Sequence, residues 1–394
     1  MQLDLYKKEL QKELSAILYF WHRHTPDTAF GGFYGKLDNF NKVFNNAPKG
    51  SVLNSRVLWA FSSAFNLTGN SDYLNMAERA FQYIVDHFID KENGGIYWTV
   101  DHMGTPLDTK KQVYALAFAI YGLSEFYLTG KNQLAKEAAT ELYHHIIEHS
   151  YDKITGGYIE ALSADWKEMS DMRLSDKDAN EKKSMNTHLH LLEGFANLYR
   201  IWANADLKNK IEELIDIFLN HVIDKEDHHL ALFFDAEWNV RSNIISYGHD
   251  IEAAWLLQEA AEIIGNEILL EKVKLRSVQI ANAAAEGLDN DGGLWYEFAE
   301  GHLIKEKHSW PQAESMIGFF NAWQITGDES YLEKSLSSWQ FVQSYILDKK
   351  HGEWFWGVKE NYTVMNEDKV GLWKCPYHNS RACIELIKRI DNVI

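Results

Sequence analysis

The sequence is poor in the features that mark secreted, membrane-spanning or nucleic-acid-binding proteins. Its 2 cysteines, Cys375 and Cys383, are too few for a disulfide framework, so we expect a reducing compartment, the cytoplasm. No apolar run approaches the roughly 18 residues of a membrane span, and the N-terminus lacks the apolar core of a signal peptide. Lys and Arg number 39 against 57 Asp and Glu, a net charge of −18 that disfavours a nucleic-acid partner. Only 5 prolines argue against long linkers, and we expect a single domain over residues 1–394.

What the sequence does contain is a repeated turn of an aspartate followed by paired glycines. Clear copies begin at Asp27, Asp90 and Asp152, and degraded copies begin at Asp224, Asp289 and Asp348. Consecutive copies are separated by about 60 to 70 residues, a period typical of an array of similar structural units.

Two alternating sets of helices are predicted between these turns. One set is amphipathic, with apolar residues on one face, over residues 3–22, 72–89, 132–149, 206–222, 267–286 and 329–346. The other set is apolar nearly all round and is therefore buried, over residues 52–67, 112–128, 187–202, 249–264, 311–325 and 376–391. Buried helices inside amphipathic ones predict an all-α (α/α)6 barrel, closed by packing of the N-terminal helix against the last inner helix. An open solenoid is the alternative, but it needs polar capping repeats that the C-terminus lacks.

Helix ends and one long loop complete this prediction. Leu-Thr-Gly or similar sequences predict left-handed glycine caps at Gly69, Gly130, Gly265 and Gly327. The charged, irregular stretch 161–186 is predicted to form a loop over one mouth of the barrel.

The same phasing locates a candidate site. Each buried helix begins a similar distance after its glycine turn, so the helix starts should share one end of the barrel. Side chains capable of chemistry cluster at these starts: Arg56, Tyr114, Asn186, His188, His190, His249, Glu252, Trp310, Glu314, Trp373, His378 and Arg381. An apolar barrel has little reason to gather histidines and arginines at one end unless they surround a ligand.

Each of these groups also has a structural interpretation. His249 and Glu252 lie one helical turn apart, and such a pair can either orient an imidazole or simply start a helix. His188 and His190 point about 200° apart on a helix, so a shared metal is not expected. Arg56 begins an apolar helix, and a buried guanidinium needs a partner or an anionic ligand.

Imidazoles on opposite faces of a sugar suit proton transfer at C2. One imidazole can remove the proton and another can return one from the far side, while an arginine stabilises the charge that develops on oxygen. Tryptophans such as Trp310 and Trp373 suit stacking on sugar rings. No Walker or Rossmann glycine-rich phosphate loop is present, and neither metal nor nucleotide cofactor is expected.

Four segments carry a resemblance to a known family: 185–193 (MNTHLHLLE), 247–257 (YGHDIEAAWLL), 310–314 (WPQAE) and 371–381 (GLWKCPYHNSR). They closely resemble the cellobiose 2-epimerases of the N-acylglucosamine 2-epimerase superfamily, over essentially the whole chain. The resemblance implies reversible conversion of the reducing-end glucose of cellobiose or lactose to mannose through a cis-enediolate.

The resemblance also implies roles for the candidate residues. His249 and His378 correspond to the acid/base pair, with Glu252 supporting His249. Arg56 and His190 are expected to act catalytically at the O1/O2 region of the intermediate. Tyr114 and Asn186 are expected to contact the reacting sugar, and Trp310 and Trp373 to hold the disaccharide. The other expected substrate-binding residues are His188 and Glu314. Ser309 departs from the aromatic residue that many members carry there, which leaves the length of the substrate less determined.

Several alternatives stay open on the sequence alone. An aldose–ketose isomerase would use nearly the same histidines and stop at the ketose, and N-acylglucosamine 2-epimerase is a poorer match near His378. An inverting glycoside hydrolase would need two carboxylates about 6.5–9.5 Å apart, for which Glu160, Glu297 and Glu314 are the candidates. A non-catalytic glycan-binding protein is disfavoured by Arg56 and the histidines. We expect a monomer, because the outer helices are polar.

Overall fold

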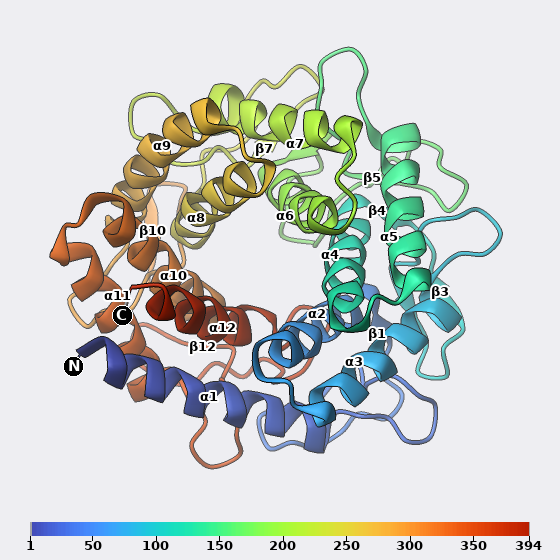
Figure 1. Ribbon diagram of the computed structural model, residues 1–394, viewed down its shortest axis with the longest axis horizontal. Helices are drawn as coiled ribbons and strands as arrows, with labels where there is room; N and C mark the ends of the chain where they lie inside the picture. Colours follow the sequence, from blue (N-terminus) through green and yellow to red (C-terminus); the bar gives the residue numbers. More distant parts are fainter. Residues whose placement is uncertain (1, 394) are drawn as a thin grey trace.

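Twelve helices form two concentric rings in the computed structural model, which describes residues 2–393 (Figure 1). The outer ring consists of α1 (Gln2–His24), α3 (Ser71–Tyr83), α5 (Gln133–His145), α7 (Ala205–Ile217), α9 (Glu267–Ala285) and α11 (Glu329–Phe341). The inner ring consists of α2 (Ser51–Thr68), α4 (Val113–Gly130), α6 (Met185–Ile201), α8 (Tyr247–Ile264), α10 (Ser309–Thr326) and α12 (Tyr377–Asp391). The predicted all-α (α/α)6 barrel is therefore confirmed.

Four outer helices end in a π-helical turn that leads into the next loop. These turns are η1 (Ile84–Phe88), η2 (Ile146–Ser150), η3 (Phe218–Val222) and η4 (Val342–Ile346). The wider turn explains why the sequence pattern predicted those helices about five residues longer than their α-helical parts.

Short polar residues start the outer helices, and left-handed residues end several inner ones. Side chains that cap the outer helices by accepting a backbone N–H bond belong to Asn70, Asn132, Asn204, Asn266 and Asp328. Gly69, Gly265 and Gly327 adopt the predicted left-handed cap. The prediction for Gly130 was wrong, because α4 runs one residue further and Lys131 takes the left-handed conformation with φ 60°.

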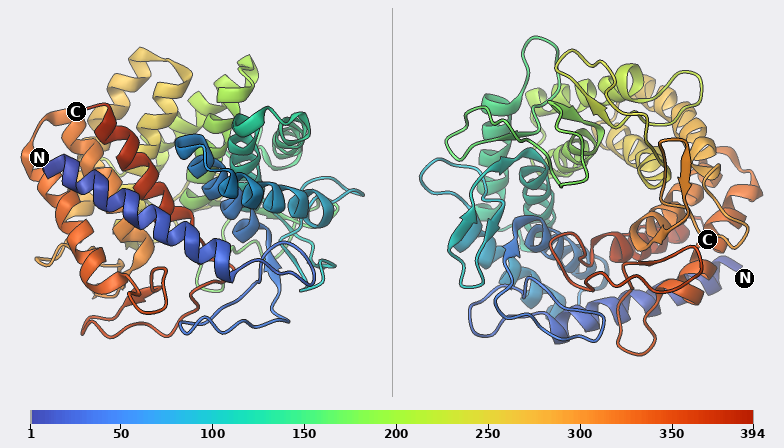
Figure 2. Two further views of the ribbon diagram at one scale, coloured as in Figure 1. Left: turned by 60° about the horizontal axis from the view of Figure 1, so that its bottom comes forward. Right: turned by 180° about the vertical axis from the view of Figure 1, so that it is seen from behind.

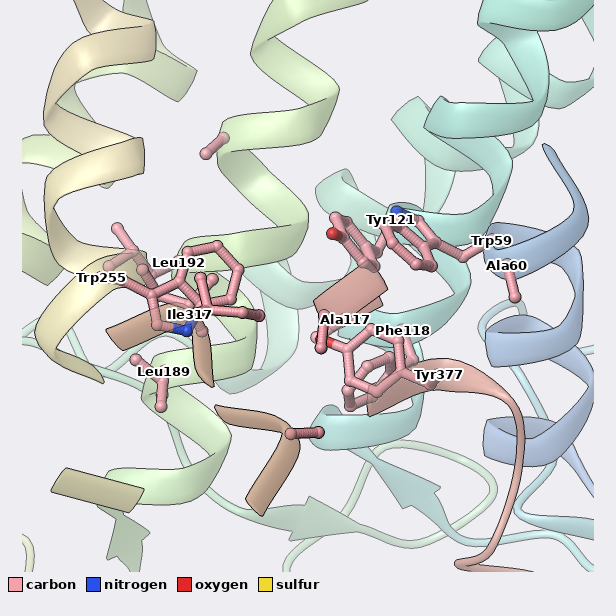
Figure 3. Packing of buried hydrophobic residues seen from close by; sticks show 14 of the residues in the cluster. Trp59, Ala60, Ala117, Phe118, Tyr121, Leu189, Leu192, Trp255, Ile317 and Tyr377 are labelled. Carbon is pink, nitrogen blue, oxygen red and sulfur yellow. The ribbon is translucent and has the colours of Figure 1, made fainter. Parts of the chain in front are cut away.

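The inner helices pack closely because small residues lie where they touch. A Cβ on Gly122 of α4 would lie 2.6 Å from the Ser55 carbonyl oxygen of α2, and one on Gly194 of α6 would lie 2.7 Å from that of Ala117. Larger side chains from several inner helices fill the space beyond these contacts; Figure 3 shows Trp59, Tyr121 and Tyr377 among them. Buried apolar side chains of this size each stabilise the fold by about 1.5–3 kcal/mol.

The ring closes where its ends meet. The N-terminal helix α1 packs against α12, and α12 packs against both α10 and α2 (Figures 1 and 2). The predicted closure of the barrel by α1 is thus confirmed, and these contacts exclude the alternative of an open solenoid.

A belt of very short strands joins neighbouring units at one end of the barrel. The strand before an inner helix pairs antiparallel with a strand of the next unit in β1–β2, β4–β5, β6–β7, β8–β9 and β11–β12. The bounds of the strands are β1 (Lys49–Gly50), β2 (Thr99–Val100), β3 (Pro106–Asp108), β4 (Lys111–Gln112), β5 (Ala161–Leu162), β6 (Lys183–Ser184), β7 (Phe233–Phe234), β8 (Ile245–Ser246), β9 (Glu297–Ala299), β10 (His302–Ile304), β11 (Lys307–His308) and β12 (Gly357–Val358). Strands of two or three residues are too short for a readable alternation of apolar and polar residues.

Buried ion pairs fix the repeated aspartate turns to this belt. Lys111 Nζ lies 2.6 Å from Asp90 Oδ2, with both side chains almost fully buried. The same pairing occurs as Lys49–Asp27, Lys183–Asp152, Lys307–Asp289 and Lys369–Asp348. The copy at Asp224 lacks it; there His229 pairs with Asp250 at 2.7 Å instead. The repeat in the sequence is therefore a repeated electrostatic contact as well as a turn.

Candidate active site

A cavity of about 670 Å³ opens at the end of the barrel where the inner helices begin. The predicted site residues that line it are Arg56, Tyr114, Asn186, His190, His249, Glu252, Trp310, Trp373 and His378. Residues 173–179 and Glu181 border it as well, so the predicted placement of segment 161–186 over one mouth is confirmed. Figure 2 shows the long connections gathered at this end of the ring.

His378 begins α12 with a carboxylate directly behind its imidazole. Nδ1 of His378 lies 2.7 Å from Oε1 of Glu314 and 3.9 Å from Oε1 of Glu252. Glu314 also accepts hydrogen bonds from Trp255 Nε1 and Arg381 Nη2. An oxygen acceptor at Nδ1 leaves Nε2 as the ring nitrogen that is available to the cavity.

His249 begins α8 beside a neutral partner. Its Nδ1 lies 2.8 Å from the Ser246 hydroxyl, and its ring centroid is 4.8 Å from that of Trp310. The Trp310 ring is in turn 5.6 Å from the His378 ring, so the two histidines flank one tryptophan. Burial lowers the pKa of His249 to about 3, and burial together with Arg56 and Arg381 lowers that of His378 well below its usual range. Both imidazoles are therefore neutral near pH 7.

The expected support of His249 by Glu252 is not present. Oε1 of Glu252 instead lies 2.5 Å from Nη2 of Arg381, since a buried guanidinium is a stronger partner for a carboxylate than a neutral imidazole. Burial and then the neighbouring Glu314 raise the pKa of Glu252 to about 7.

Arg56 carries a charge that no acidic side chain neutralises among residues 2–393. Its Nη2 donates to the Tyr114 hydroxyl at 2.7 Å, and its guanidinium lies 4.1 Å from the Phe118 ring and 4.7 Å from the Tyr377 ring. The side chain is only 3% exposed, and its Nε has no hydrogen-bond partner in the described structure. Aromatic faces stabilise the cation without cancelling its field, which suits an anion in the cavity.

His190 and Asn186 lie on α6 beside this guanidinium system. Nδ1 of His190 lies 2.9 Å from Oε2 of Glu193, and its ring packs edge-on against Tyr114 at 5.1 Å. The carbonyl oxygen of the Asn186 side chain is buried and has no partner within the described residues. It is available to accept a hydrogen bond from a bound hydroxyl group.

Three predicted site residues lie outside the cavity lining: His188, Glu314 and Arg381. His188 accepts a hydrogen bond from Tyr158 N at Nε2 and contacts the Ser184 carbonyl oxygen through Nδ1, so both ring nitrogens are already used. Residues two positions apart on a helix point in nearly opposite directions, as expected from the sequence. His188 therefore points away from the cavity when His190 points into it. Glu314 is fully buried behind His378 rather than exposed to a ligand.

The chain matches a known protein family over most of its length. A family model of N-acylglucosamine 2-epimerase matches residues 32–382. The chain belongs to this family. It is 46% identical to the cellobiose 2-epimerase of Bacteroides fragilis over 98% of this chain and 99% of that protein, and 37% identical to that of Dictyoglomus turgidum over 99% and 100%. The solved cellobiose 2-epimerase of Bacillus thermoamylovorans superposes with a TM-score of 0.95 at 38% identity, covering 98% of this chain and 100% of that one.

Membership of the epimerase family makes this protein a carbohydrate isomerase. Its cavity also contains Glu160, which the sequence suggested only for a hydrolase, and Tyr296 and His308, which the sequence did not single out. Glu160 lies in the cavity wall, where it accepts hydrogen bonds from Ser184 and Thr187, and burial raises its pKa to about 7. Tyr296 stacks on His308 with ring centroids 3.9 Å apart, and both line the cavity. These residues lie outside the helices, so the helical pattern of the sequence does not place them. Contacts between separate units of the chain bring them to the mouth of the barrel.

Among residues 2–393, a cluster of two carboxylates and a histidine beside the cavity already contains a cation. Donor atoms of Glu252, Glu314 and His378 lie within 4.8 Å of one another, a spacing that could hold a metal ion. The Arg381 guanidinium contacts both carboxylates of this cluster. Across residues 2–393, no helix has the length and apolar character needed to cross a membrane.

Proposed function

We propose that this epimerase converts the reducing-end glucose of β-1,4-linked disaccharides such as cellobiose and lactose to mannose, and back. The observation that carries this proposal is the arrangement of two neutral histidines, His249 and His378, in one cavity with the unneutralised Arg56. The relatives named cellobiose 2-epimerase support the choice of substrate.

The proposed chemistry begins with the open-chain sugar, whose C1 carbonyl acidifies the proton on C2. One histidine removes this proton through Nε2, and the electron pair moves onto O1 to give a cis-enediolate. Arg56 stabilises the negative oxygen, a contribution of about 3–4 kcal/mol for a well-placed donor. The other histidine returns a proton to the opposite face of C2, and the carbonyl reforms with inverted configuration.

The environments of the two histidines differ, which suits opposite roles. His378 is backed by Glu314, which stabilises an imidazolium, whereas His249 is backed by the Ser246 hydroxyl. Burial raises the pKa of Glu252 to about 7, and its Oε1 lies 3.9 Å from Nδ1 of His378. Tyr114, His190 and Asn186 are proposed to contact the reacting sugar, and Trp310 and Trp373 to hold the disaccharide by stacking.

We propose a single catalytic domain that acts as a cytoplasmic monomer without a metal, because Arg381 takes the position of a cation beside Glu252 and Glu314. Ser309 lines the cavity next to Trp310, so the pocket for the second sugar has room where a larger side chain would reduce it.

The decisive experiment is incubation of the protein with cellobiose in D2O, followed by NMR of the reducing-end sugar. Glucosyl-mannose with deuterium at C2 is the expected product. Glucosyl-fructose as the main product would replace the proposal with an aldose–ketose isomerase, and free glucose would replace it with a hydrolase. Lactose and N-acetylglucosamine in parallel reactions define the substrate class.

A further inference from the structure

One buried guanidinium connects three carboxylates behind the cavity. Arg381 lies on α12, one turn after His378, is 0% exposed and does not line the cavity. Its Nη1 contacts Glu193, and its Nη2 lies 2.5 Å from Glu252 Oε1 and 2.7 Å from Glu314 Oε1. These carboxylates come from α6, α8 and α10, so Arg381 joins four inner helices.

Two of these carboxylates continue directly to histidines of the cavity. Glu193 Oε2 lies 2.9 Å from Nδ1 of His190, and Glu314 Oε1 lies 2.7 Å from Nδ1 of His378. The chain of contacts Arg381–carboxylate–imidazole therefore occurs twice, once toward each side of the cavity. An ionised carboxylate can only accept, so in both cases the imidazole carries its hydrogen on Nδ1.

Charge balance makes this arrangement depend on the guanidinium. Three carboxylates within reach of one another in a buried space repel, and without a cation they are driven to take up protons. A protonated Glu193 or Glu314 becomes a hydrogen-bond donor toward Nδ1. The imidazole would then carry its hydrogen on Nε2, which is the nitrogen that must be bare to accept a proton from the substrate.

We propose that Arg381 is a positioning residue that holds His190 and His378 in the Nδ1–H form by keeping Glu193 and Glu314 ionised. Arg381 acts through these carboxylates and does not touch the substrate. Its consequence for catalysis rests on the proposed function, whereas the state of the two imidazoles is a property of the free protein.

The direct test is nitrogen NMR of protein labelled at histidine, which distinguishes the two neutral forms of each imidazole. We compare the natural protein with Arg381→Met, which removes the charge, and Arg381→Lys, which keeps it. His190 and His378 are expected to be Nδ1–H forms in the natural protein and in Arg381→Lys, and to gain the Nε2–H form in Arg381→Met. Unchanged imidazoles in Arg381→Met would overturn the proposal.

A matched control lies on the same helix. Arg389 of α12 donates to Asn321 and Gln324, which are neutral, and it is remote from the cavity histidines. Arg389→Met is expected to leave both imidazoles and the exchange rate unchanged. If Arg381→Met does not fold, Arg381→Gln removes the same charge but keeps a polar side chain, and the same two outcomes decide the proposal.

Kinetics separate positioning from a structural role. Arg381→Met is expected to lower kcat for exchange at C2 by about 10²- to 10⁴-fold, as misplacement of a catalytic imidazole hydrogen does elsewhere, with KM within about threefold. Arg381→Lys should recover a large part of this loss. A lower unfolding temperature with kcat unchanged would indicate a structural role only. If the natural protein exchanges no sugar proton, the proposed function fails, but the NMR result still decides the role of Arg381.

Discussion

Oε1 of Glu314 lies 2.7 Å from Nδ1 of His378, whose imidazole lines the cavity while Glu314 does not. Burial raises the pKa of Glu314, and the hydrogen bonds from Arg381 and Trp255 oppose that rise. The carboxylate thus has two donors besides the histidine, and its orientation is fixed. We therefore propose that Glu314 acts through His378, since it does not line the cavity.

Replacing Glu314 with Gln tests this relationship. The amide oxygen can still accept from Nδ1, but the negative charge that stabilises an imidazolium is lost. We expect kcat to fall by about 10²-fold or more while KM changes little. Steady-state kinetics with cellobiose check this, and a rise in KM without loss of kcat would return Glu314 to a substrate-binding role.

Replacement of either cavity histidine should stop exchange at C2. His249→Asn and His378→Asn each remove the group that accepts or returns the proton, and a loss of about 10²- to 10⁴-fold is expected for each. The measurement is deuterium incorporation at C2, with circular dichroism to verify folding. His144→Asn on the outer helix α5, where His144 is exposed, is the matched control and should keep full activity. Retention of more than a few per cent of activity would remove that histidine from the acid/base pair.

Replacing Arg56 should lower the reaction rate strongly but the stability of the fold only a little. Arg56→Met keeps the stem among the Phe118 and Tyr377 rings but removes a cation that has no acidic partner to leave behind. We expect kcat to fall by about 10²- to 10³-fold because the enediolate oxygen loses its stabilisation. The free energy of unfolding, measured in urea, should fall far less for Arg56→Met than for Arg381→Met. Arg381 is paired with three carboxylates, which its replacement leaves buried without a cation.

Each lysine–aspartate pair at the belt should contribute strongly to stability. Lys111→Met leaves Asp90 buried and unpaired, and we expect a loss of about 3–5 kcal/mol in the free energy of unfolding. Urea denaturation checks this. Lys167→Met, which breaks the exposed pair with Asp165, is the control and should leave the urea midpoint unchanged.

His188 should make the fold sensitive to acid. Burial lowers its pKa from 6.5 to about 4 in the folded state, so below pH 6.5 the unfolded chain takes up a proton that the folded chain does not. Its stabilising contribution is present above pH 6.5 and is lost as the pH falls toward 4. Between pH 7 and pH 5 this amounts to about 2 kcal/mol.

Removing this histidine should therefore reduce the pH dependence. His188→Gln keeps an acceptor for Tyr158 N but does not titrate. Unfolding free energies measured at pH 7 and pH 5 should differ by about 2 kcal/mol less in the variant than in the natural protein. An equal difference in both proteins would assign the acid sensitivity to other groups.

The helices and their order follow from local sequence, whereas the short strands and the buried ion pairs do not. An apolar run such as that of α4 specifies a buried helix through its own periodicity, and its glycine turn fixes where it begins. The two-residue strands and the Lys111–Asp90 contact depend on a neighbouring unit, so no periodicity within a segment records them.

The functional site also depends partly on local sequence and partly on tertiary contacts. The sequence by itself determined the all-α barrel, the end at which the inner helices begin, and the presence of His249, His378 and Arg56 there, because phase along a helix is a local property. Only the tertiary structure decided which partner each of them has. Glu252 turned to Arg381 instead of His249, and Glu314 lies behind His378, because a buried charge selects the strongest partner within reach from any helix of the ring.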